Sequence, residues 1–124
     1  MTLVGHSDSL GRTLICTAIG AGAGGLTALF FGRIMTKEFD VLDLGNGILV
    51  GLVGNGAACA FTDPWAAVPI GMIAAIIYKL VCALYIKFRI DDPCDAGPIH
   101  GATGLWGGKK IELLFFQYKT KLCS

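Results

Sequence analysis

Residues 91–107 have the sequence DDPCDAGPIHGATGLWG, which carries carboxylates and one histidine into a glycine-rich apolar segment. Asp92 followed by Pro93 predicts a helix start, because the carboxylate can accept unpaired N–H groups and proline fits the first helical position. Counted from Asp92, His100 then lies about 12 Å inside the helix. In a bilayer that depth is below the headgroups, and a titratable ring there indicates a functional site.

The composition is that of a membrane protein. Of the 124 residues, 54% are hydrophobic and 15% are charged, whereas average soluble domains have about a quarter charged residues. The net charge of +1 and the lack of a lysine or arginine run argue against nucleic-acid binding. The five cysteines form no Cys-x-x-Cys pair, and the sequence has no nucleophile paired with a base and no phosphate loop. We therefore expect neither an enzyme nor a bound metal or cofactor.

Three apolar runs are each long enough to cross the hydrocarbon core of a membrane as one helix, and they cover residues 13–32, 44–62 and 64–86. The second run ends at Asp63-Pro64, because a residue before proline is disfavoured in a helix. The first contains Gly20 and Gly24, a spacing that lets helix backbones approach closely in lipid. The sequence therefore predicts an all-α, multi-span transmembrane protein.

Several polar side chains lie inside these runs. Asn46 and Asn55 cannot be satisfied by lipid, so we expect them to face other helices or a lined cavity. Lys79 lies within the third run, and its long stem predicts that it snorkels toward the interface. Tyr78 and Tyr85 suit interfacial aromatic anchors near the same end.

A fourth apolar run, residues 94–108, is short for a full span and resembles half of one. Pro98 is expected to kink this helix just before His100, because an interior proline removes a backbone hydrogen bond. Glycines recur at every third position and predict a bare stripe for close helix packing; they are Gly101, Gly104 and Gly107.

Loop charge predicts an orientation. The connections after the first and third runs contain cations, whereas the turn at Asp63 has none, so the positive-inside rule places those two connections in the cytoplasm. The amino terminus is then outside. The same count places the cationic, aromatic tail at residues 108–124 outside as well, against the rule. We therefore expect this tail not to continue the fourth span and not to belong to the fold.

Short motifs occur along residues 9–107 in a characteristic order. They are Gly11-Arg12-Thr13, Asn46-Gly47, Gly51-Leu52-Val53, Cys59, Pro64-Trp65-Ala66-Ala67, and Asp91-Asp92-Pro93 followed by His100-Gly101 and Gly104-x-x-Gly107. This pattern resembles the ammonium transporter (Amt/Mep/Rh) family, and most of all its eukaryotic Amt-type members. The last block is the most specific. By resemblance, the four segments are similar to the seventh through tenth of the family's eleven spans.

The resemblance implies roles for individual residues. His100 matches the second of two histidines that face each other in the narrow apolar pore of each family subunit. Asp92 and Asp95 match carboxylates at the start of its helix, and with Asp91 we expect them to hold that helix rather than touch substrate. The resemblance further implies ammonium or ammonia as substrate, a homotrimer in the lipid bilayer, and the plasma membrane as location.

The chemistry of an imidazole suits this task. Moving the hydrated ammonium cation through an apolar pore is costly unless the cation loses a proton or its donors find acceptors. A neutral imidazole can accept a hydrogen bond from the substrate or relay a proton, because its pKa lies near physiological pH. The sequence thus predicts channel-like conduction past His100.

The chain also departs from the family pattern. The first pore histidine, the aromatic gate and the outer cation-recruiting site belong to spans that would precede Met1. Family members usually have a threonine before Ala-Gly-Cys in their eighth span, whereas this chain has Asn55-Gly56-Ala57-Ala58-Cys59. We therefore expect residues 9–107 to be a partial ammonium transporter domain, with a non-matching tail at 108–124, in a truncated chain that is not active alone.

Two alternatives stay open. The chain could be a nonconducting scaffold or modulator that packs against full-length transporter subunits through its glycine faces. A weaker alternative is a membrane-embedded metal hydrolase using Asp92, Asp95 and His100, whose spacing matches no recognised metal site. For His100 itself, the alternative to a pore role is a packed helix histidine bonded to a neighbour.

Overall fold

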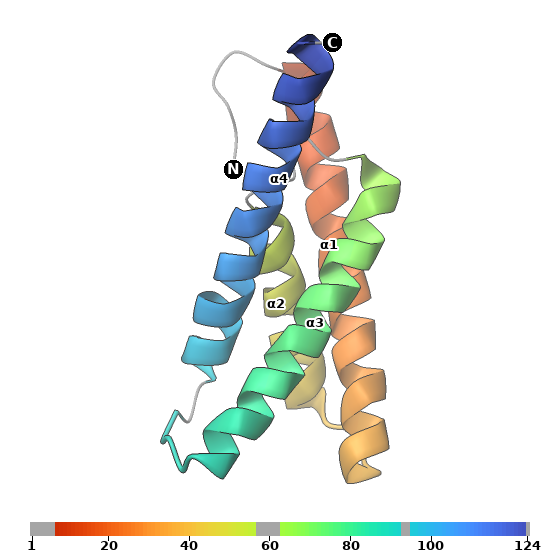
Figure 1. Cartoon of the computed structure of the whole chain (residues 1–124). Helices are drawn as coiled ribbons and strands as arrows, with labels where there is room; N and C mark the ends of the chain where they lie inside the picture. Colours follow the sequence, from red (N-terminus) through yellow and green to blue (C-terminus); the bar gives the residue numbers. More distant parts are fainter. Residues whose placement is uncertain (1–6, 57–62, 93–94, 124) are drawn as a thin grey trace.

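The computed structural model describes residues 7–56, 63–92 and 95–123, and this part of the chain is all-α. Its helices are α1 (Ser7–Thr36), α2 (Val41–Gly56), α3 (Pro64–Lys87), the π-helix η1 (Gly97–Ala102) and α4 (Thr103–Cys123). The helices alternate in direction, so the α1–α2 and α3–η1 connections lie at one end of the bundle (Figure 1). This is the arrangement expected of consecutive spans, and the side of the membrane stays a prediction.

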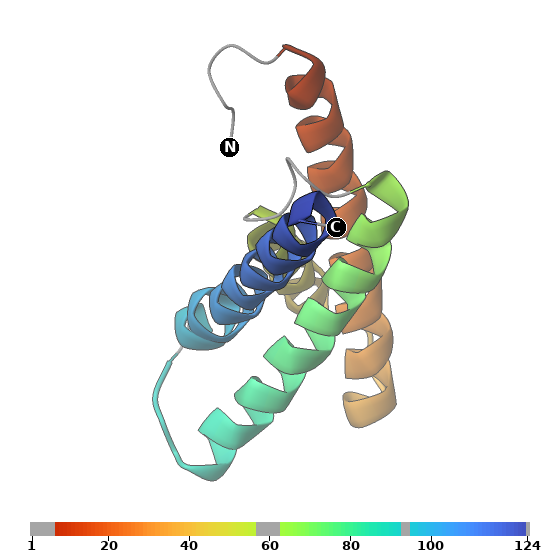
Figure 2. The ribbon, with the colours of Figure 1, turned by 45° about the horizontal axis from the view of Figure 1, so that its top comes forward.

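The α2–α3 pair forms the centre of the bundle. It lies between α1 on one side and η1 with α4 on the other, in both views (Figures 1 and 2). The core contains side chains from α1, α2, α3 and η1, namely the large Tyr78 and the smaller apolar residues Ala28, Val50, Ala74, Ala75 and Ile99. Much apolar surface faces outward, as on α1, where Phe30 and Ile34 are 63% and 75% exposed. Such a surface suits a lipid or helical environment rather than water.

Two helices are long and apolar enough to cross a membrane within the described residues. They are Leu10–Thr36, with 27 residues, and Pro64–Lys87, with 24. The apolar helix α2 has 16 residues. The rest of the predicted second span, residues 57–62 with Cys59, lies outside the described part of the chain.

Glycines bring α1 against α2 and α3. A Cβ atom added to Gly24 would lie 2.6 Å from the carbonyl oxygen of Gly47, and one added to Gly71 would lie 2.5 Å from that of Gly20. Real Cβ atoms do not approach a backbone oxygen so closely, so the helices can meet here only without side chains. The close approach predicted at Gly20 and Gly24 is confirmed.

The fourth helical segment begins later than predicted. Asp92 is not helical, Pro93 and Cys94 lie outside the described residues, and Asp95 has a φ of 51° in the left-handed region. Helical structure runs from Gly97, with Pro98 in the first turn, where its missing N–H needs no partner. Pro98 therefore starts the helix and does not kink it. The predicted start at Asp92 was wrong, and His100 lies one turn inside the helix, not two.

The expectation that the helix ends near residue 108 was also wrong. In the structure α4 continues to Cys123. Residues 109–123 contain neither glycine nor proline, and lysine, leucine, glutamate and glutamine favour helix. The Lys110 ammonium also lies over the Trp106 ring, 5.8 Å from its centroid, an interaction that links the cationic segment to the preceding turn.

Substituting Gly24 with alanine tests this packing. We expect Gly24→Ala to destabilise the bundle by about 1–3 kcal/mol, because its methyl group would push α1 away from α2. Gly22→Ala is the matched control, since nothing lies within 4 Å of a Cβ atom at that position. Thermal unfolding of the purified protein in detergent, followed by circular dichroism, measures both. Equal midpoints for the two variants would contradict the packing argument.

Candidate functional site

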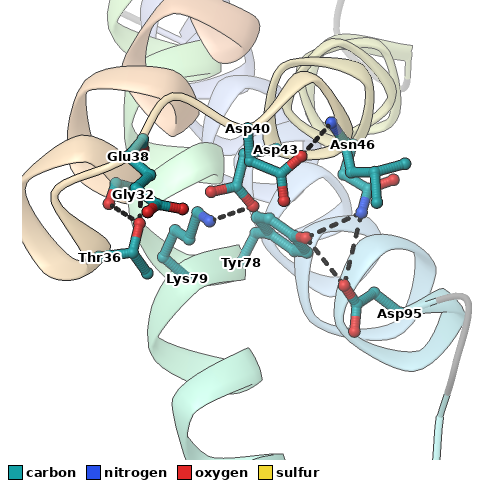
Figure 3. Close-up of polar contacts among 10 residues, drawn as sticks. Gly32, Thr36, Glu38, Asp40, Asp43, Asn46, Tyr78, Lys79 and Asp95 are labelled. Carbon is teal, nitrogen blue, oxygen red and sulfur yellow. Dashed lines mark hydrogen bonds and ion pairs between the residues drawn. The ribbon is translucent and has the colours of Figure 1, made fainter.

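A group of polar side chains joins α2, α3 and the segment before η1, and we call it the polar cluster. It lies near the end of the bundle that holds the α1–α2 and α3–η1 connections (Figure 3). Its members are Asp43 and Asn46 from α2, Tyr78 and Lys79 from α3, and Asp95. Asp43 and Asn46 are three residues apart and so share one helix face.

Tyr78 is at the centre of this cluster. Its hydroxyl accepts a hydrogen bond from Asn46 Nδ2 at 3.1 Å and donates one to Asp95 Oδ2 at 3.1 Å. Asn46 Nδ2 also donates to Asp95 Oδ2 at 3.4 Å. The prediction that Asn46 faces other helices is confirmed. The prediction of an interfacial anchor at Tyr78 was wrong, because its side chain is only 1% exposed and bonds inside the bundle.

Lys79 does not snorkel as predicted. Its Nζ lies 2.5 Å from an oxygen of Asp43, and the two side chains are only 11% and 20% exposed. On α1, Gly32 leaves room for this pair, since an added Cβ atom would lie 3.4 Å from Lys79 Nζ and closer still to the Asp43 carboxylate. An ion pair with so little solvent depends on both partners, because either charge alone would be costly to bury.

Asn55 is the second amide that was expected to face other helices, and this is confirmed. Its Nδ2 donates to the carbonyl oxygens of Gly51 at 3.1 Å and of Ala67 at 3.4 Å. The side chain occupies the space beside Gly20, where a Cβ atom would overlap it. Asn55 therefore joins α2 to the start of α3, in the crowded part of the bundle.

His100 lies in η1 with its side chain exposed, whereas the preceding Pro98 and Ile99 are buried. Within the described residues no hydrogen bond holds the imidazole. The alternative of a packed histidine bonded to a neighbour therefore has no support among these residues. The helix around it is unusual, because π-helices are rare and occur frequently at functional sites. The imidazole is thus presented outward from the bundle.

The three carboxylates at this helix start have different surroundings. Asp92 Oδ2 accepts the backbone N–H of Gly97 at 2.8 Å, which satisfies a donor in the first turn of η1. Asp95 contributes its backbone oxygen to the N–H of Ile99 at 3.0 Å and its side chain to the polar cluster. Asp91 is exposed.

The predicted glycine stripe packs at one end only. A Cβ atom on Gly107 would lie 3.1 Å from the carbonyl oxygen of Gly54 on α2, and one on Gly104 would lie 3.8 Å from Val53. Gly101 has open space beside it. In the described part of the chain, no three histidine, cysteine or acidic side chains are grouped as a metal site would require.

Comparison with known proteins identifies the family. The family described as the Ammonium Transporter Family matches residues 2–122. The chain belongs to the ammonium transporter family. This confirms the resemblance predicted from the Asp91-Asp92-Pro93 block and His100-Gly101, and the match also extends into the cationic segment after residue 108.

Individual members of the ammonium transporter family show the same relationship. Ammonium transporter 1 member 3 of Solanum lycopersicum is 36% identical over 103 residues, which are 83% of this chain and 22% of that protein. A putative ammonium transporter of Synechocystis is 40% identical over 110 residues, or 87% of this chain and 25% of that protein. The chain therefore spans about a fifth to a quarter of the length of these relatives.

Solved structures of ammonium transporter family members share this fold. Saccharomyces cerevisiae Mep2 superimposes with a TM-score of 0.78 at 31% identity, over 82% of this chain and 23% of Mep2. A mutant of Candida albicans Mep2 gives 0.76 at 28% identity, over 80% of this chain and 25% of its own. The chain is accordingly an integral, multi-span helical membrane protein.

The ion pair of the polar cluster gives a direct stability test. We expect Lys79→Met to destabilise the bundle by about 2–3 kcal/mol, because it leaves the largely buried Asp43 carboxylate, 20% exposed, without a counter-charge. Adding Asp43→Asn to the same protein should recover much of that loss. Arg12→Gln is the control, since Arg12 and Asp63 are 3.8 Å apart and more than half exposed, and should cost at most about 1 kcal/mol. Thermal unfolding in detergent distinguishes these outcomes, and equal losses for Lys79→Met and Arg12→Gln would refute the argument.

Proposed function

We propose that this chain forms part of a pathway for ammonium or ammonia across a membrane, and that His100 lines this pathway. The observation that supports the proposal best is the outward presentation of the imidazole, beside two buried residues of the same helical turn. The family supports the substrate, since the relatives that match are named ammonium transporters. No enzymatic reaction is part of this proposal.

The proposed role follows from the chemistry of the substrate. An ammonium ion has four N–H donors, and removing it from water into an apolar passage leaves those donors unpaired. An imidazole nitrogen that is not engaged within the protein can accept one of them or take up a proton. His100 is suited to this because its side chain is exposed and unbonded in the described part of the chain.

The carboxylates are proposed to hold the pathway wall and not to contact substrate. Asp92 accepts the Gly97 N–H and Asp95 is engaged by Tyr78 and Asn46. By resemblance to the family, we also propose a homotrimer of the complete protein and a location in the plasma membrane. We propose that the 124-residue chain alone conducts little, because one exposed histidine on one bundle provides only part of an enclosed passage.

Replacing His100 tests the pore role. We propose a chimera in which residues 9–107 replace the matching segment of Saccharomyces cerevisiae Mep2, expressed in cells that lack their own ammonium uptake. His100→Ala should lower uptake at least about tenfold, which corresponds to 1.4 kcal/mol of lost stabilisation. Leu105→Ala is the control, because Leu105 is 68% exposed on the next helix segment and has no polar group to offer. Unchanged uptake and selectivity in the His100→Ala chimera would contradict the proposed role of His100.

A second candidate function is a nonconducting scaffold or modulator of full-length transporter subunits. The large apolar surface of α1 favours it, because outward-facing residues such as Leu14, Leu26 and Phe30 are more than half exposed and could pack against other helices. In that case the tagged chain should co-purify with a full-length transporter and change its uptake, while showing none of its own. A chain that fails to co-purify would exclude this alternative.

A further inference from the structure

Asp95 is where the chain turns into the helix that carries His100. Its backbone has a φ of 51°, a left-handed conformation that aspartate adopts more readily than most residues. Its N–H donates to the Asp92 carbonyl oxygen at 3.2 Å, and its own carbonyl oxygen accepts the N–H of Ile99 at 3.0 Å. The backbone of Asp95 therefore sets the direction in which η1 leaves the connection.

The side chain of Asp95 is held by two other helices. Tyr78 Oη on α3 and Asn46 Nδ2 on α2 both donate to the same oxygen, Asp95 Oδ2 (Figure 3). Tyr78 belongs to the buried core beside Ala74 and Ala75, so its hydroxyl has little freedom to move. Hydrogen bonds to an ionised carboxylate are stronger than those between neutral groups.

We propose that Asn46 and Tyr78 form an interhelical latch on Asp95 that sets the position of η1 and, through it, of the His100 imidazole. Asp95 and His100 are separated by less than two helical turns, so a shift of the latch moves the ring with the helix. Asn46, Tyr78 and Asp95 are thus positioning residues. Their importance for transport rests on the proposed pore role of His100, but the latch itself is a property of the fold.

The α3 helix offers a matched pair of tyrosines to test the latch. Tyr78→Phe removes only the hydroxyl that donates to Asp95. Tyr85 lies two turns further along the same helix and packs against Gly97, where an added Cβ atom would lie 2.6 Å from its hydroxyl. Within the described residues its hydroxyl has no hydrogen bond, so Tyr85→Phe keeps the ring beside Gly97 and removes no contact of the latch.

Hydrogen–deuterium exchange of the purified full chain in detergent gives the readout. In Tyr78→Phe we expect amides of residues 97–103 to exchange about fivefold faster. This is the factor by which losing one hydrogen bond of average net strength raises the equilibrium constant for local opening. Amides in the glycine contacts of α1 should keep their rates, and Tyr85→Phe should match the unchanged protein throughout. Unchanged exchange at 97–103, or a uniform rise across α1 and η1, would overturn the latch.

Variants of Asp95 provide a second, independent arm. Asp95→Gly removes the acceptor while keeping a residue that favours a positive φ, so the backbone itself is not strained. Asp95→Asn keeps an acceptor oxygen for Tyr78 and also tolerates the left-handed region. The latch predicts fast exchange at 97–103 in Asp95→Gly and substantial rescue in Asp95→Asn. If Asp95→Gly exchanges as slowly as the unchanged protein, Asp95 serves only the backbone turn and the latch is wrong.

The exchange measurement and the uptake measurement fail separately. If Tyr78→Phe speeds exchange at residues 97–103 while His100→Ala leaves uptake unchanged, the latch is supported and the pore role of His100 is contradicted. If Tyr78→Phe speeds exchange at residues 97–103 and His100→Ala lowers uptake, then uptake of the Tyr78→Phe chimera should fall while that of the Tyr85→Phe chimera stays the same. A Tyr78→Phe chimera with normal uptake, alongside an impaired His100→Ala chimera, would overturn the claim that the latch positions the imidazole.

Discussion

Polar side chains that enter this apolar bundle are costly to leave unpaired, and the partners that they find inside it restrict how the helices are arranged. The Asp43–Lys79 ion pair and the hydrogen bonds of Asn46 and Tyr78 join α2 to α3 near one end of the bundle. Asn55 joins them again, through the carbonyl oxygen of Ala67. In a medium without water these contacts have no solvent alternative, so each restricts the relative position of its two helices.

The two sides of the central α2–α3 pair are held by different means. On the α1 side, backbone approaches backbone at Gly24 and Gly47, and van der Waals packing dominates. On the η1 side, the Asp95 carboxylate is held by side-chain hydrogen bonds. Glycine packing fixes the distance between helices but leaves sliding and rotation less defined, whereas directed hydrogen bonds fix a particular register. The more sharply defined side is the one that carries His100.

Sequence reasoning succeeded where a rule depends on one residue and its medium. An amide in an apolar run must face protein, which is why the orientation of Asn46 and Asn55 could be predicted without knowing their partners. It failed for Lys79 and Tyr78 because their roles depend on partners far away in the chain, Tyr78 being 32 residues from Asn46. A lysine that snorkels and a lysine that forms an ion pair have the same sequence pattern, and only the rotation of the helix distinguishes them.

The start of the fourth helix shows how a local signal can be overridden. Asp-Pro is a strong helix start by itself, yet the carboxylate of Asp92 reaches Gly97 and the backbone turns at Asp95, whose side chain is held by α2 and α3. Tertiary hydrogen bonds at Asp95 thus accompany a helix start that lies closer in sequence to His100 than Asp92 does. His100 is exposed on this bundle, so a pathway that desolvates a cation beside the ring needs neighbouring helices to close around it and exclude water. In the proposed pore role, His100 therefore requires a larger assembly that provides the opposite wall of the passage.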